Sequence, residues 1–209
     1  MEQAQELTPR AKAKRDQIRV GAQRVFLRRG FAGASTDAIA AEAGVSKQTL
    51  YAYYPNKENL LAEVLGHLIG EGSGNQLPAV EGMPLGTPEE VRRSLGSLAR
   101  GLIASLMQPD YLALMRVVIA ETPRLPRLGS LFKSAVPEQV LGNVSEILRI
   151  ARANGVVGDV DPDSAARMFA GALLTYAILD GLLVGDGPAR PPAQERVDSV
   201  VDLFMKTIS

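Results

Sequence analysis

The chain has 209 residues, 46% of them hydrophobic and 22% charged, which is enough apolar material for a buried core and enough charge for a soluble protein. It contains no cysteine, and this excludes a disulfide framework, a thiolate nucleophile and a Cys-ligated metal. The 23 Lys and Arg residues balance the 23 Asp and Glu residues over the whole chain. Residues 1–57, however, carry 10 Lys and Arg against 5 Asp and Glu, and a basic head of this kind is what a DNA-binding surface needs.

The first predicted helix runs from about Pro9 to Arg29 and ends at Gly30. Its apolar residues recur at helical spacing, and its other faces carry most of the basic charge of the head. The N-terminus has no apolar run ahead of a small-residue cleavage site, so we expect no secretory signal and a cytoplasmic protein.

Residues 35–54 predict two short helices joined by the tight turn Ala43-Gly44-Val45-Ser46. Gly44 stands where the first of these helices must stop and reverse, a position that favours a left-handed backbone, and the Ser46 hydroxyl can cap the second. A helix offered N-terminus first to a major groove needs polar side chains at its start and outer side. The second helix carries such side chains at Lys47, Gln48, Thr49, Tyr51 and Tyr53. The alternative is a helical hairpin in a core with a solvated polar face.

Several features follow one another over residues 10–70. An amphipathic first helix closes on Phe26 to Phe31, and Ser35-Thr36 opens the second helix. The remaining segments are Ile39-Ala40-Ala41-Glu42-Ala43-Gly44-Val45-Ser46, Thr49-Leu50-Tyr51-Ala52-Tyr53-Tyr54 and Asn56-Lys57-Glu58-Asn59-Leu60-Leu61. With these features the chain resembles the TetR family of transcriptional regulators. Beyond residue 85, Arg116-Val117-Val118-Ile119-Ala120-Glu121 and Asp161-Pro162-Asp163 resemble one subgroup of TetR-type ligand domains.

The resemblance implies an all-α protein of about nine helices. A three-helix, helix-turn-helix DNA-binding head would occupy residues 10–56, with the motif at about 35–54. A helical ligand-binding and dimerisation body would occupy residues 57–209.

The resemblance also implies roles for individual residues of the head. Thr36, at the N-terminus of the second helix, would donate to a phosphate, although it could serve only as a helix cap. Base edges would be contacted by Lys47, Gln48 and Thr49: Gln48 can pair with adenine, and the Thr49 methyl can pack on a thymine methyl. Plain surface solvation is the alternative. Contacts to phosphates would come from Tyr51, Tyr53 and Lys57, whereas Tyr54 would be core and Asp37 is unfavourable near phosphate.

Further helices are predicted along the body. The fourth helix starts near Asn56 and fades into a glycine-rich connection at 70–86 that we expect to be poorly ordered. Thr87-Pro88-Glu89-Glu90 forms a capping box for a helix that reaches about Met107. Later helices are expected at Tyr111–Glu121, Leu128–Lys133, Pro137–Asn154, about 161–185 and about 192–208.

A small-molecule effector would need a pocket within this body. The candidate lining residues are Tyr111, Met115, Arg116, Phe132, Phe169 and Tyr176, most of which equally suit a plain core. Asp159, Asp161 and Asp163 alternate as in a metal loop, but Asp161-Pro162 is an ordinary helix start, so we expect no metal and no cofactor. His67, the single histidine, is expected at the surface or at an interface.

The last two predicted helices suggest a second subunit. Met168 to Gly185 is apolar apart from a few residues, but it is short and contains Asp180 and three glycines, so we expect a buried helix and no membrane span. That helix has more apolar surface than one side can cover. Pairing of residues 162–185 and 192–208 with their copies would form a homodimer; alternatively, both helices complete the core of a monomer.

These patterns predict a sequence-specific DNA-binding transcriptional regulator. The expected form is a homodimeric repressor, released from a palindromic operator on double-stranded DNA by a small apolar effector. An activator of the same fold and a helical small-molecule carrier remain alternatives. With no cysteine, one histidine, no phosphate-cradling glycine loop and no nucleophile elbow, we expect no enzyme.

Overall fold

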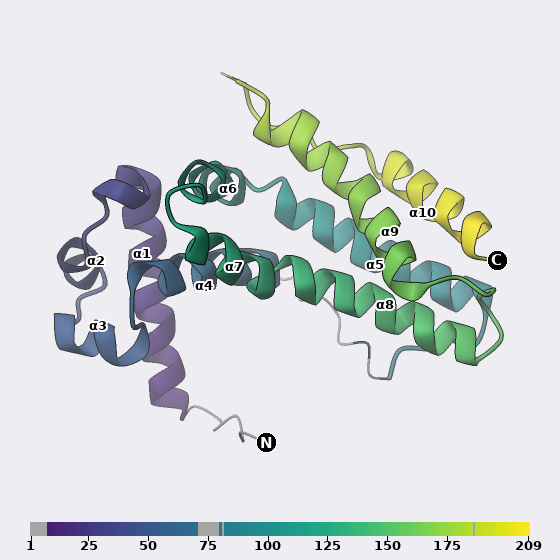
Figure 1. Ribbon diagram of the computed structural model, residues 1–209, viewed down its shortest axis with the longest axis horizontal. Helices are drawn as coiled ribbons and strands as arrows, with labels where there is room; N and C mark the ends of the chain where they lie inside the picture. The colour runs from purple at the N-terminus through teal and green to yellow at the C-terminus, as the bar shows by residue number, and fades with distance from the viewer. Residues whose placement is uncertain (1–7, 71–79, 81, 186) are drawn as a thin grey trace.

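The computed structural model describes residues 8–70, 80, 82–185 and 187–209. Every element within these ranges is helical, which confirms the predicted all-α class. The head lies at one end of an elongated molecule, at the left of Figure 1, and the body extends away from it. Most of the predicted connection at 70–86 lies outside the described residues.

The head consists of α1 (Pro9–Gly33), α2 (Thr36–Glu42) and α3 (Lys47–Tyr53). Gly30 has a left-handed φ of 65°, so regular helix breaks at the glycine that was predicted to end it. The chain then turns so that Phe31 stacks on Phe26 with ring centroids 5.9 Å apart. Around this pair the head buries its part of the one apolar core that continues into the body: Ile18, Ala22, Val25, Ile39, Ala40, Ala43, Leu50 and Tyr54.

Three helices occupy the middle of the molecule: α4 (Lys57–Gly70), α6 (Pro109–Glu121) and α7 (Pro126–Ala135). Both α4 and α6 contact α1, and α4 packs along α7. Pro109 and Pro126 begin α6 and α7, each two residues ahead of the predicted start, because proline is tolerated in the first turn of a helix. The central helices are therefore the connection through which the head and the body touch.

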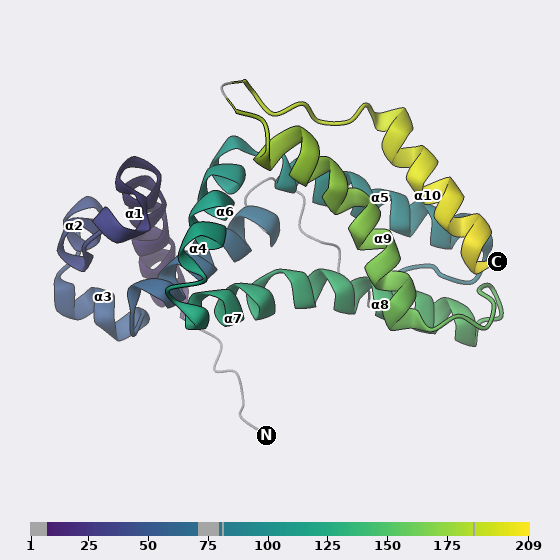
Figure 2. The same cartoon turned by 45° about the horizontal axis from the view of Figure 1, so that its top comes forward.

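The far end of the body is built from α5 (Pro88–Leu106), α8 (Pro137–Ala153), α9 (Pro162–Ala177) and α10 (Gln194–Ile208). The predicted capping box is present, because Glu90 N donates to Thr87 Oγ1 and the Glu90 carboxylate accepts from the Thr87 backbone. In Figure 2, α9 and α10 lie on the outer side of the body, with α5 behind them and α8 below. Arg92 and Arg100 of α5 pair with Asp202 and Asp198 of α10 at 2.6 and 2.8 Å.

The helix predicted at 161–185 differs from the observed structure at its C-terminal end. Regular α-helix stops at Ala177 and continues as one π-helical segment, η1 (Ile178–Leu182). Arg116 of α6 binds this end: its guanidinium donates to the carbonyls of Gly181 and Leu182 at 2.9 and 3.1 Å. This contact joins residues about 65 positions apart, and no local pattern in the sequence predicts it.

A row of large apolar side chains remains uncovered on the outer side of the body. Leu179 and Leu183 are 62% and 70% exposed, and the other members are Met168, Leu174, Ile178 and Leu203. By length and composition, Pro162–Leu182 could cross a membrane, with a mean hydropathy of 1.3, but only 33% of it is buried inside the molecule. The isolated chain thus leaves one side of this apolar helix uncovered, while its other sides pack on α5, α8 and α10.

Candidate nucleic-acid interface

The turn between α2 and α3 has the predicted geometry. Gly44 adopts a left-handed φ of 61°, and the backbone N–H groups of Gly44 and Val45 donate to the carbonyls of Ala41 and Ala40. Ser46 caps α3, since its hydroxyl accepts from the Thr49 N–H at 3.0 Å. These contacts fix the angle at which α3 leaves α2.

The turn is also held against α1 by two residues that the sequence reasoning missed. The Gln17 amide donates to the Ala43 carbonyl at 2.6 Å. Gly21 permits close approach of the two helices, because a Cβ placed there would lie 2.8 Å from the Ala43 Cα. A glycine one turn after Gln17, in the middle of a predicted helix, was the available signal.

The outer side of α3 presents the residues predicted to read bases. Lys47 and Gln48 are exposed and Thr49 is half-buried. The Gln48 amide makes no hydrogen bond to the part of the chain that the structure describes, so it is available to a ligand. The Thr49 hydroxyl lies 2.8 Å from the Ser46 hydroxyl, which leaves the Thr49 methyl as its apolar contact group.

Beside this edge, hydroxyl groups of α2 and α3 come together. Thr36 Oγ1 and Tyr51 Oη lie 3.3 Å apart, and either can donate. Asp37, which appeared unfavourable near phosphate, pairs with Lys47 at 2.8 Å and is thereby neutralised. The same hydrogen bond to Asp37 raises the pKa of Lys47. Tyr53 is half-buried on the same helix.

Lys57 has a contact within the protein that its predicted phosphate role did not anticipate. Its ammonium group donates to the Phe31 carbonyl at 2.6 Å and lies 4.2 Å from the centroid of the Phe31 ring. Lys57 therefore ties the start of α4 to the end of α1, 26 residues earlier.

Tyr54 lies in the core, as predicted, with 2% of its surface exposed. Burial raises the pKa of Tyr54 to about 12. Its ring lies beneath the Arg15 guanidinium, 5.7 Å from the centroid, and Arg15 pairs with Glu63 of α4 at 2.7 Å. This sequence of contacts connects the end of α3 with α4.

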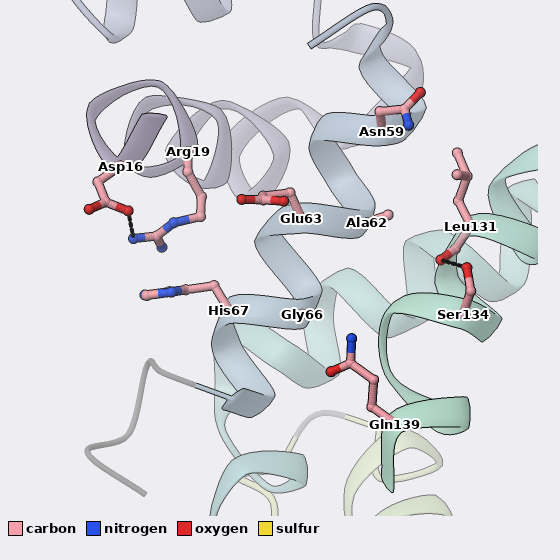
Figure 3. A pocket seen from close by; sticks show the side chains of 10 residues that line it. All are labelled: Asp16, Arg19, Asn59, Ala62, Glu63, Gly66, His67, Leu131, Ser134 and Gln139. Carbon is pink, nitrogen blue, oxygen red and sulfur yellow. Dashed lines mark hydrogen bonds and ion pairs between the residues drawn. The ribbon is translucent and has the colours of Figure 1, made fainter. Parts of the chain in front are cut away.

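A polar cavity of about 450 Å³ lies where the head meets the body. Figure 3 shows its lining side chains, which come from α1, α4, α7 and α8. Arg19 is only 6% exposed and pairs with Asp16 at 3.2 Å. The His67 side chain points toward this Asp16–Arg19 pair (Figure 3). His67, expected at the surface or at an interface, thus lies at the connection between the two parts.

A second cavity, of about 330 Å³ and lined almost wholly by apolar side chains, lies within the body. Three of the six predicted pocket residues line it: Tyr111, Met115 and Phe132. Arg167 of α9 also lines it, and the sequence reasoning did not identify this residue. The rest of the lining is Leu102, Leu106, Val136, Pro137, Val140, Leu141, Ala170, Gly171 and Leu174.

The structure places the other three predicted pocket residues elsewhere. Arg116 binds the end of η1 as described above. Phe169 faces α10, with its ring centroid 4.9 Å from that of Phe204. Tyr176 lines a shallow groove with Asp180 and Arg190. Helical periodicity identified apolar positions but not the neighbour that each would meet.

The aspartates at 159–163 act in local structure. Asp161 caps α9 by accepting from the Ser164 N–H at 2.8 Å, and hydrogen bonds from the side chain and the backbone of Ser164 lower the pKa of Asp161. Asp159 pairs with Arg152. Among the described residues, no three His, Cys, Asp or Glu side chains form a group that could hold a metal ion.

The geometry of residues 35–54 defines a helix-turn-helix DNA-binding protein. Family comparison agrees: the profile "Bacterial regulatory proteins, tetR family" matches residues 18–64. The profile "AefR-like transcriptional repressor, C-terminal domain" matches residues 93–207, more than half of the chain. The chain belongs to the TetR family of transcriptional regulators, whose members bind DNA and small-molecule effectors and act as dimers.

Individual relatives show where the similarity is concentrated. The regulator EthR of Mycolicibacterium smegmatis is 36% identical over 74 residues, which is 35% of this chain and 34% of EthR. The repressor SCO4008 of Streptomyces coelicolor is 60% identical over 40 residues, 19% of this chain and 21% of that protein. This chain therefore matches only about a fifth to a third of these relatives. The solved structure of the flavonoid-responsive regulator FrrA superposes with a TM-score of 0.68 at 29% identity, covering 94% of this chain and 95% of FrrA.

Proposed function

We propose that the protein is a homodimeric repressor that binds a palindromic operator and releases it when a small apolar effector enters the body. The observation that carries the proposal is the exposed edge of α3. Gln48 is exposed there and Thr49 is half-buried, and the hydroxyls of Thr36 and Tyr51 lie close to each other on the same two helices. This arrangement suits base contacts flanked by phosphate contacts.

In this proposal each side chain of the edge has a distinct role. Gln48 pairs with an adenine and Thr49 packs on a thymine methyl, while Lys47 contacts a neighbouring base. Thr36, Tyr51 and Tyr53 donate to phosphates and set the register of the helix in the groove. Lys57 contributes in two ways. Its ammonium group donates to the Phe31 carbonyl at the end of α1, and its positive charge attracts the phosphates of the DNA.

A homodimer is supported by the uncovered apolar row on α9, η1 and α10. Burying Leu179 and Leu183 against a second copy would remove them from water, and each fully buried leucine contributes about 1.5–3 kcal/mol. Two heads related by a two-fold axis would read a palindrome, with half-sites about one helical turn of DNA apart or more. Binding to chromosomal DNA implies a cytoplasmic protein.

Release of the operator would pass through α4, which packs on both α1 and α7. The apolar cavity is lined by residues of α5, α6, α7, α8 and α9, and Phe132 is the lining residue that α7 contributes. A ligand that displaces α7 would move α4, and the polar cavity beside Glu63 and His67 leaves room for that movement. The spacing of the two heads would change, so the effector would favour the conformation with weak affinity for DNA. The name of FrrA describes a regulator that responds to flavonoids, and the AefR-like profile is named for a repressor. Both names are consistent with a repressor that a small molecule releases from DNA.

Selection from random duplexes by the purified chain tests the proposal. We expect enriched sequences with two inverted half-sites and protection of both in a footprint. Leu183→Glu should convert the dimer to monomers in sedimentation and abolish tight binding, whereas the control Leu27→Glu, an exposed leucine on α1, should remain dimeric. If no sequence is enriched but an apolar ligand still raises the melting temperature, the protein is a helical carrier instead.

A further inference from the structure

The apolar cavity is lined by Tyr111, a tyrosine whose hydroxyl is not paired within the described part of the protein. Tyr111 is 4% exposed and lines the cavity, and its hydroxyl makes no hydrogen bond within the part of the chain that the structure describes. Burial raises the pKa of Tyr111, and no neighbouring charge or hydrogen bond contributes to the shift. The hydroxyl is therefore a protonated donor, and a ligand that covers it without offering an acceptor would leave that donor unpaired at a cost in free energy.

Arg167 is the one charged residue among those that line the cavity. It lies on α9, is exposed to solvent, and forms no ion pair with any residue that the structure describes. Its alkyl stem can cover the apolar lining while its guanidinium stays in water at the edge of the cavity. A guanidinium in that position favours a planar anion such as a carboxylate, which it binds through two parallel hydrogen bonds.

We infer that the effector is a small amphipathic carboxylate. Its apolar body fills the cavity, an oxygen atom accepts from the Tyr111 hydroxyl, and its carboxylate pairs with Arg167. The inference rests on the proposed function, because it takes this cavity to be the effector site. A neutral hydrocarbon would cover the Tyr111 hydroxyl without offering it an acceptor, and a cation would be repelled by Arg167 with no lining carboxylate to compensate. The volume of about 330 Å³ is near the lower end for ligand sites and favours a small body.

Calorimetric titration of the full-length protein with three matched probes tests the inference. The probes are 2-naphthoate, its uncharged methyl ester and the cation 2-naphthylmethylammonium. We expect 2-naphthoate to bind tightest. Arg167→Gln should weaken 2-naphthoate about tenfold or more and leave the ester within twofold, because a hydrogen bond to a charged group is lost. Tyr111→Phe should weaken both the acid and the ester, about threefold to tenfold.

Two variants serve as matched controls, because each makes the same type of substitution at a residue that does not line the cavity. Arg124→Gln removes an exposed arginine that does not line it. Tyr176→Phe removes a hydroxyl from the separate groove beside Arg190. Neither should change the affinity for any of the three probes.

The outcomes separate this inference from the proposed effector site. If the ester or the cation binds as tightly as the acid, or if Arg167→Gln leaves the affinity for 2-naphthoate unchanged, the carboxylate assignment is overturned while the site itself stands. Gly171→Leu should abolish binding of every probe, because a Cβ at Gly171 meets nothing within 4 Å and the leucine would occupy the cavity. If no probe binds, or if Gly171→Leu leaves binding unchanged, both the inference and the proposed effector site fail.

Discussion

Gly21 in the head and Gly171 in the body are used in opposite ways. In the head, a Cβ at Gly21 would lie 2.8 Å from the Ala43 Cα, so glycine is what allows α1 and the turn to touch. In the body, a Cβ at Gly171 would meet nothing within 4 Å, so glycine there leaves space open. The head is thus closely packed to hold α3 at a fixed angle, whereas the body retains empty volume.

The polar groups near the turn of the head and those at the cavity of the body also differ in whether they have partners inside the protein. In the head, Glu42 pairs with Arg24 and Arg28, and Gln17 satisfies the Ala43 carbonyl. In the body, Arg167 and the Tyr111 hydroxyl lack partners among the described residues, and the large apolar row on α9 and α10 is uncovered. The body thus leaves contacts for molecules that bind to it. In the head, the Arg15 Nε and the Tyr54 hydroxyl are buried without a hydrogen-bond partner inside the described part of the protein.

The largest expected effect comes from filling the close contact in the head. Gly21→Ala should lower the free energy of unfolding by about 1–3 kcal/mol, as overpacking does, and weaken duplex binding more than tenfold because the turn must move. Thermal unfolding and fluorescence anisotropy with the selected duplex would measure both. The matched control is Gly142→Ala on α8, where a Cβ meets nothing, and it should raise stability by about 0.5–1 kcal/mol. Equal melting temperatures for the two variants would contradict the comparison.

The next effect concerns the buried Tyr54 hydroxyl. Its pKa of about 12 in the folded protein exceeds the ordinary value of 10.0, so the folded state holds the proton more tightly. This contribution to stability is complete below pH 10 and is lost as the pH rises toward 12, by up to about 2 kcal/mol. Urea unfolding of the wild type and Tyr54→Phe between pH 8 and 11.5 would isolate it. Parallel stability curves would show that the hydroxyl is not desolvated.

In the body, filling the open space should be favourable. Gly171→Leu replaces a helical glycine and adds apolar burial, so we expect the free energy of unfolding to rise by about 1 kcal/mol. A loss of stability in chemical denaturation would mean that the cavity cannot hold the added side chain.

A smaller effect distinguishes the two roles of Lys57. Lys57→Met should lower stability by about 1 kcal/mol without DNA, because the hydrogen bond to Phe31 and the contact with its ring are lost. If Lys57 acts only inside the protein, the dependence of log affinity on log salt keeps its slope. A slope that falls by about one would instead reveal a phosphate contact.

The helix-turn-helix motif of the head could be predicted because its defining contacts join residues that are close together in the chain. Gly44, Ser46 and the helices around them are specified by neighbours within a few positions, and the burial of Tyr54 follows from the spacing on α3. The clamp formed by Gln17 and Gly21 on the turn was missed because it joins α1 to residues 22 to 26 positions later.

The pocket was less predictable because long-range packing decides which side of a helix meets an open space. Tyr111 and Met115 were identified as aromatic or flexible apolar residues, but the same criterion selected Phe169, which packs on Phe204. Arg116 was a candidate because it is a charge on an apolar helix, and it is used to hold η1. Arg167 was overlooked because an exposed arginine on a helix is ordinary until the cavity beside it is known.

The measurement that tests the central claim most directly is the affinity of Gln48→Ala for the selected duplex and for each of its single-base-pair variants. If the exposed edge of α3 reads bases, the substitution should cost about 1–3 kcal/mol on the selected sequence and remove the preference at one base pair of each half-site, leaving the others intact. An unchanged affinity with every preference retained would contradict the account, because the exposed side-chain amide of α3 would then have no part in recognition.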